Sequence, residues 1–216
     1  MFHSGTLLAV VVYFRNDLWI IMKGLVAAMK GEKEGREGAK LFLLIVIASI
    51  PTGLIGIFFK DWFESLFSRP SLVGVMLLIT GGILALTHWM NKEGRPFARM
   101  RWMDAFLIGI VQGLAIIPGI SRSGATISTG LFLGLSRELS GRFSFLLSIP
   151  AIVGATFIEF QTIGNGEEIW ISLAGTATAF VVGILTLPFL MSIIKMRKLS
   201  NFSYYCWIVG ILIIIL

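Results

Sequence analysis

The sequence predicts an all-α integral membrane protein with about six transmembrane helices and one re-entrant helix hairpin. Three observations support this fold class. Of the 216 residues, 56% are hydrophobic and only 14% are charged, whereas soluble domains are about 25% charged and less than half apolar. The apolar residues form runs that approach the thickness of a bilayer. Lys and Arg gather in short segments between those runs, as they do in cytoplasmic loops.

Seven apolar segments follow one another along the chain: 2–14, 41–59, 71–90, 103–118, 143–160, 169–194 and 204–216. A span needs about 20 apolar residues, and segments 41–59, 71–90 and 169–194 meet this length easily. Segment 2–14 is short and begins at the first residue, so we expect further chain before it. No linker divides the sequence, so we expect a single polytopic membrane domain over 1–216.

Residues 17–30 predict a helix that lies in the membrane interface. Apolar residues such as Trp19 and Leu25 alternate there with Lys23 and Lys30 at roughly helical spacing. The alternative, in which this stretch continues the first span, stays open.

The placement of charge predicts the topology. Loops 30–40, 91–101 and 195–198 are rich in Lys and Arg, which assigns them to the cytoplasmic side. Loop 60–70 has mixed charge and loop 159–168 holds Glu without Lys or Arg, which assigns both to the outer side. The net charge is +6, but the basic residues form no stripe, so nucleic-acid binding is not expected.

Counting membrane crossings predicts where the hairpin lies. The chain must cross an odd number of times between loops 91–101 and 159–168, yet segments 103–118 and 143–160 would make two crossings. The parity is restored if 103–135 is a re-entrant hairpin that dips into the membrane and returns. Backbone broken at membrane depth is tolerated where it is buried in protein or lines a wet cavity.

The tip of this hairpin, residues 118–124, reads PGISRSG and predicts a phosphate-binding site. Pro and Gly suit a helix break. Arg122 in an apolar zone is costly and marks a functional site, and its planar fork matches phosphate oxygens. The N–H groups that open a helix bind anions, and Ser121, Ser123 and Thr126 offer hydroxyls. The alternative, in which Arg122 lies at the membrane surface among ordinary turn residues, stays open.

Several stretches carry a resemblance to a known family. These are GIVQGL at 109–114 with PGISRSGAT at 118–126, HSGTLLAVVVYFR at 3–15, GLSRELSGRFSFLLSIPAIVGA at 134–155 and FSYYCWIVG at 202–210. Together they resemble the undecaprenyl-diphosphate phosphatase family, known for bacitracin resistance, along the whole chain.

The resemblance implies two inverted repeats, each with a broken hairpin, whose tips meet at one site in the cell (inner or plasma) membrane. It implies hydrolysis of a polyprenyl diphosphate lipid to the monophosphate carrier of cell-wall synthesis. It further implies that Arg122 clamps the diphosphate, that Ser121 and Thr126 hydrogen-bond to it as catalytic residues, and that substrate binding involves Ser123, Gly119 and Gly124. Gln112 either faces this site or makes a helix–helix hydrogen bond. A homo-oligomer is also left open.

The chain departs from the family pattern in one respect. The family's acidic E/QxxxE stretch and its PxSSxGH segment are absent. Those segments supply carboxylates suited to Mg²⁺ or another divalent cation, and a His suited to nucleophilic or acid–base work. A divalent cation is therefore expected for the family's reaction, but this chain has no evident metal ligand and no evident general base.

Three functions remain open. In the first, the chain is an N-terminally short phosphatase. In the second, it holds a half-site that binds or translocates a polyprenyl phosphate without hydrolysing it, since transporters build their binding sites from broken helices. In the third, it is a structural membrane subunit without a ligand. The last function leaves Arg122 unexplained, so we rank it below the others.

Overall fold

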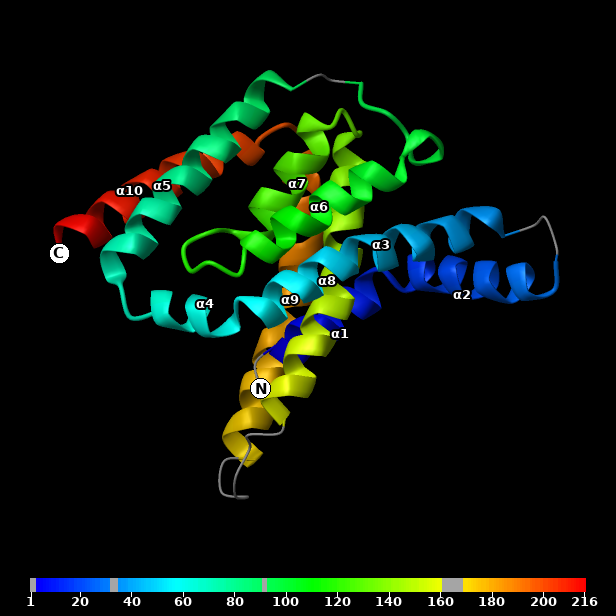
Figure 1. The fold of residues 1–216 in the computed structure, drawn as a ribbon, viewed down its shortest axis with the longest axis horizontal. Coiled ribbons are helices and arrows are strands. Elements are labelled where there is room, and N and C mark those ends of the chain that lie inside the picture. Colours follow the sequence, from blue (N-terminus) through cyan, green and yellow to red (C-terminus); the bar gives the residue numbers. More distant parts are fainter. Residues whose placement is uncertain (1–2, 32–34, 91–92, 161–168) are drawn as a thin grey trace. The chain divides into compact units, whose positions relative to one another are not determined.

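The computed structural model describes residues 3–31, 35–90, 93–160 and 169–216, with backbone only at 3, 157–160 and 169–172. Every regular element in these residues is a helix (Figure 1), so the all-α prediction is confirmed. The α-helices are α1 His3–Tyr13, α2 Arg15–Met29, α3 Arg36–Phe58, α4 Lys60–Leu66, α5 Pro70–Leu86, α6 Trp102–Leu114, α7 Arg122–Phe132, α8 Arg137–Phe160, α9 Ile169–Lys195 and α10 Phe202–Ile215. Short 3₁₀ turns are η1 Thr87–Trp89, η2 Phe97–Arg99 and η4 Leu199–Asn201.

Four of the described helices are long and apolar enough to cross a bilayer. They are α3, α5 with η1, α8 and α9, and the bent pair α1–α2 makes a fifth if it counts as one span. In the most apolar window of α9 only 22% of the residues are buried by the rest of the protein, so most of its apolar surface faces outward, as in a helix surrounded by lipid. Helices α6 and α10 are apolar but shorter.

Two local expectations can be compared directly with the helices. The helix expected at 17–30 is present as α2, and its axis turns 74° from that of α1, so α2 does not continue α1 in a straight line. The segment expected at 103–118 is helical only to Leu114, and the chain turns between Ala115 and Pro118. Residues 161–168 of the predicted outer loop lie outside the described part.

The chain forms two compact units. The first contains residues 1–45 and 145–191, and in it α2 and the start of α3 approach closely enough that a Cβ on Gly24 would lie 2.5 Å from the Ala39 nitrogen. Phe14 stacks on Phe145 in the same unit, with ring centroids 5.9 Å apart.

The second unit contains residues 46–144 and 192–216 and holds the predicted hairpin. Within it α5 packs along α10, and α6 packs against α7 (Figure 1). Small residues allow the α5–α10 contact: a Cβ on Gly74 would lie 2.8 Å from the Gly210 carbonyl oxygen, and Trp207 Nε1 donates to the Leu78 carbonyl at 3.2 Å. Helix α5 also packs against α7, so it connects α10 to the hairpin.

The α5–α10 contact predicts an asymmetry between two glycines of α5. Gly74→Ala would place a Cβ 2.6 Å from Ile214 Cγ1, so we expect a loss of about 1–3 kcal/mol of stability from overpacking. Gly82→Ala meets nothing within 4 Å and is expected to be neutral or to gain up to about 1 kcal/mol. Thermal unfolding of the detergent-solubilised variants measures both, and equal midpoints would contradict the close packing.

Candidate functional site

The segment 103–135 consists of a helix, a break and a second helix. Helix α6 ends at Leu114, α7 begins at Arg122, and the two pack against each other. Between them the chain tightens into turns, with Ile116 N donating to the Gly113 carbonyl and Ile117 N to the Leu114 carbonyl. The tip therefore lies where Pro118 and Gly119 were expected to break the helix.

Gly119 is constrained by helix α5. Its φ is +92°, in the left-handed region that favours glycine. A Cβ there would lie 2.4 Å from the Val73 carbonyl oxygen and 2.9 Å from Met76 Cβ. The resemblance assigned Gly119 to close approach of a phosphate, and the structure gives an additional reason for a glycine: the tip lies directly against the α5 backbone.

Ser121 begins helix α7. Its Oγ accepts a hydrogen bond from Gly124 N at 3.2 Å, and its carbonyl accepts one from Ala125 N at 2.8 Å. This is the ordinary N-cap arrangement for serine. A Cβ on Gly124 would lie 2.9 Å from Ser121 Oγ, so the glycine makes room for the cap. The hydroxyl proton of Ser121 makes no hydrogen bond to the described residues.

Arg122 is the one charged side chain of the tip. It is half-buried, and in the described part of the chain its guanidinium makes no hydrogen bond and no ion pair. The backbone N–H groups of Arg122 and Ser123 likewise have no partner among the described residues. A guanidinium and two N–H donors at the start of a helix can together bind an anion.

Thr126 lies one helical turn beyond Arg122 and is fully buried, at 1% exposure. Its Oγ1 donates to the Arg122 carbonyl at 2.8 Å and lies 2.5 Å from Ser144 Oγ on α8. Because a hydroxyl has one proton, Ser144 is the donor of that second bond. The Thr126 hydroxyl thus joins α7 to α8 in this arrangement, and a direct bond to a phosphate would require it to leave these partners.

Gln112 is buried between helices. Its Nε2 donates to Thr52 Oγ1 on α3 at 3.4 Å, while its Oε1 has no partner among the described residues. Thr52 Oγ1 in turn donates to the Gly109 carbonyl at 2.8 Å. The helix–helix hydrogen bond that the sequence left open for Gln112 is therefore present, and its role toward a substrate stays a prediction.

The residues at the tip do not fit a divalent cation. Within the described part of the chain, no three His, Cys, Asp or Glu side chains are grouped closely enough to hold a metal ion. Mg²⁺ in proteins is bound through carboxylates and substrate phosphates, and the tip offers hydroxyls and a guanidinium. No metal-dependent step can be derived from these residues.

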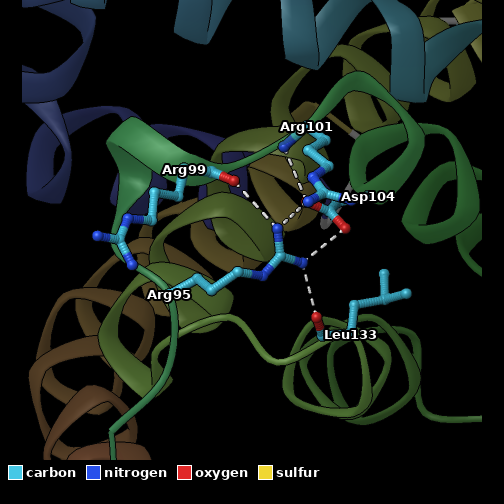
Figure 2. Close-up of polar contacts among 5 residues, drawn as sticks. All are labelled: Arg95, Arg99, Arg101, Asp104 and Leu133. Atoms are coloured by element: carbon cyan, nitrogen blue, oxygen red, sulfur yellow. Dashed lines mark hydrogen bonds and ion pairs between the residues drawn. The ribbon is translucent and has the colours of Figure 1, made fainter.

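The end of the hairpin opposite the tip is held by Arg95 (Figure 2). Its guanidinium forms a two-pronged pair with Asp104 of α6, at 3.0 and 2.9 Å. The same guanidinium donates to the Leu133 carbonyl at 2.7 Å, just beyond α7. Asp104 Oδ2 also accepts from Arg101 N at 2.8 Å, as an acid at a helix N-terminus does. Arg95 therefore ties the first turn of α6 to the residue that follows α7.

Sequence reasoning missed two contacts that support the hairpin. It counted Arg95 only as a cytoplasmic loop charge, although an Arg nine residues before an Asp that opens a helix could have suggested a pair. It also treated Thr80 as part of an apolar span. The structure places Thr80 Oγ1 within hydrogen-bonding distance of Gly119 and Ser121, and the only sequence signal was a lone Thr before two glycines.

Comparison with known proteins confirms the family resemblance. The family model described as "Bacitracin resistance protein BacA" matches residues 1–212. An Alkaliphilus metalliredigens protein named undecaprenyl-diphosphatase is 41% identical over 225 residues, covering 100% of this chain and 82% of that protein. A protein of the same name from Methanothermobacter thermautotrophicus is 48% identical over 176 residues, covering 79% of this chain and 97% of the relative.

Arg95 gives a prediction about stability. Side-chain exposure is 28% for Arg95 and 7% for Asp104, so Arg95→Ala leaves a buried carboxylate without its partner and should cost about 2–3 kcal/mol. Arg95→Lys should recover part of this loss, because a Lys cannot form the two-pronged pair.

The control for Arg95 is Lys195→Ala. Lys195 pairs with Glu138 at 2.8 Å, but the two side chains are 50% and 65% exposed, so this change should cost less than about 1 kcal/mol. Chemical or thermal unfolding of the solubilised proteins measures both. Equal losses for the two variants would show that Arg95 does not hold the hairpin.

Proposed function

Since this chain belongs to the bacitracin resistance protein BacA family, we propose that it is an undecaprenyl-diphosphate phosphatase. It hydrolyses a polyprenyl diphosphate to the monophosphate lipid and inorganic phosphate. The observation that supports this most directly is the half-buried residue Arg122: its guanidinium has no partner among the described residues, and it opens a helix whose first two N–H groups are also unpaired there. Such a set of donors matches the oxygens of a diphosphate.

The tip can contribute to the reaction by binding and by stabilising charge. A water oxygen forms a bond to the terminal phosphorus, and the bond from that phosphorus to the bridging oxygen breaks. Catalysis of phosphoryl transfer is mostly positioning and electrostatic stabilisation. Arg122 is proposed to clamp the diphosphate, with Ser121, Ser123 and the N–H groups at the start of α7 as further donors. No general base is assigned to the described residues.

The membrane arrangement is part of the same proposal. The six spans would be α1, α3, α5, α8, α9 and α10, with α6 and α7 as a re-entrant hairpin in the inner or plasma membrane. The continuity of α3, α8 and α9, each of which runs from one compact unit into the other, supports one polytopic membrane domain. The inverted repeat implied by the family belongs to this proposal as well.

A second function is favoured by the lack of carboxylate or histidine groups with metal-binding geometry in the described part of the chain. The half-site would then bind or translocate a polyprenyl phosphate without hydrolysing it. Both functions require Arg122 to bind phosphate, and they differ in whether inorganic phosphate is released.

Phosphate release from a prenyl diphosphate tests the proposed function. We expect the purified, solubilised chain to release phosphate, and EDTA to abolish the release if a divalent cation is required. Arg122→Ala should lower the rate by at least about 100-fold, as loss of a charge-stabilising donor does. Arg122→Lys should keep part of the activity, because Lys supplies a positive charge but lacks the planar fork of donors.

The matched control is Arg99→Ala, because Arg99 is exposed and, among the described residues, only its backbone N–H and carbonyl make hydrogen bonds. It should retain the parent rate. Failure of the parent to release phosphate while it still binds a non-hydrolysed prenyl phosphate would favour the second function. Equal rates for Arg122→Ala and the parent would contradict the role of Arg122.

A further inference from the structure

Thr80, on helix α5, contacts the tip from a neighbouring helix. The residue is buried, at 2% exposure. Its Oγ1 donates to the Gly119 carbonyl at 3.1 Å and accepts from Ser121 N at 3.4 Å. One hydroxyl therefore satisfies two backbone groups, one on each side of Ile120.

Several other threonines in the described helices bond within their own helix, and Thr52 and Thr126 do so in addition to a contact with another helix. Thr87, Thr129, Thr178 and Thr186 each donate to a carbonyl three or four residues earlier in the chain. Such local bonds are the usual way for a Thr to satisfy its hydroxyl in an apolar helix. In the described part of the chain, the hydrogen bonds of the Thr80 hydroxyl all go to the tip.

The position of Ser121 sets the geometry of the anion-binding groups. Ser121 is the N-cap of α7, and its side chain and carbonyl fix Gly124 and Ala125. The unpaired N–H groups of Arg122 and Ser123 follow it directly. A shift of the Ser121 backbone would therefore change the direction of those two N–H groups. It would also move the Cα of Arg122 and with it the start of that side chain.

Other contacts with α5 limit how the tip can move. Gly119 lies against the Val73 carbonyl, and a Cβ on Gly124 would lie 3.4 Å from Leu84 Cδ2. Val73, Met76, Thr80 and Leu84 recur at helical spacing and so share one face of α5. Among these four residues Thr80 alone has a side chain that can donate a hydrogen bond, and it bonds to backbone groups of the tip.

We infer that Thr80 is a positioning residue for the phosphate-binding tip, and this inference rests on the proposed phosphatase function. Its hydroxyl holds Ser121 so that the first N–H groups of α7 point to the terminal phosphate. Loss of the hydroxyl should therefore lower kcat, because misplacement of binding groups weakens the transition state.

The test compares Thr80→Val with Thr80→Ser. Valine has nearly the same shape without the hydroxyl, so we expect kcat for prenyl diphosphate hydrolysis to fall by about 10- to 100-fold. Serine keeps the hydroxyl and should stay within about threefold of the parent. The control is Thr87→Val. Thr87 is buried and follows α5 directly, and in the described part of the chain its hydroxyl bonds only to the Leu84 carbonyl, so this variant should match the parent.

A second readout does not depend on activity. Amide hydrogen exchange in peptides that cover residues 115–125 should be faster in Thr80→Val than in the parent, because the Ser121 N–H loses its acceptor and the tip opens more often. Thr80→Ser and Thr87→Val should exchange as the parent does in these peptides.

The two readouts separate the ways in which the inference can fail. Unchanged exchange in Thr80→Val overturns the contact itself, whether or not the parent is active. Faster exchange with an unchanged kcat overturns the positioning role and leaves the proposed function intact. A parent that neither hydrolyses nor binds a prenyl diphosphate overturns the proposed function, and with it the role that we assign to Thr80.

Discussion

The unpaired guanidinium of Arg122 is the feature on which the account of this hairpin depends. A charged side chain in a membrane costs about 3 kcal/mol or more, and proteins normally offset that cost with a partner. In the described residues Arg122 has none, so its charge is available to a ligand. Arg122 is the first residue of α7, where two N–H groups are also without partners among the described residues. In the proposed function, a phosphate would satisfy these donors.

The hairpin is supported at both ends, by different kinds of interaction. At the tip, α5 provides close packing at Gly119 and the neutral hydrogen bonds of Thr80. At the opposite end, Arg95 pairs with Asp104 and binds the Leu133 carbonyl. Neutral bonds suit apolar surroundings, because they satisfy backbone groups without burying another charge. The ion pair lies where Arg95 is still partly exposed, so its desolvation costs less.

The sequence predicted the features that depend on local pattern. Runs of apolar residues predicted the helices. The PGISRSG stretch predicted the break and the serine and arginine at the start of the helix that follows it. Contacts between distant segments could not be predicted in this way. Thr80 is 39 residues from Gly119, and nothing in its neighbourhood indicates a partner. Thr126 was expected to face the substrate because it lies near Arg122, yet its hydroxyl bonds to the chain and to Ser144. The direction of a side chain depends on packing, which a single sequence does not reveal.

The most direct test of the account is equilibrium binding of a prenyl diphosphate analogue in which a methylene group replaces the bridging oxygen. This compound keeps the charge and the phosphate oxygens but cannot be hydrolysed at the bridge, so binding is measured without turnover. The account predicts that the parent chain binds it far more tightly than the corresponding prenyl alcohol, and that Arg122→Ala removes this preference. Equal affinity of the parent for the analogue and the alcohol would contradict a phosphate-binding site at the tip.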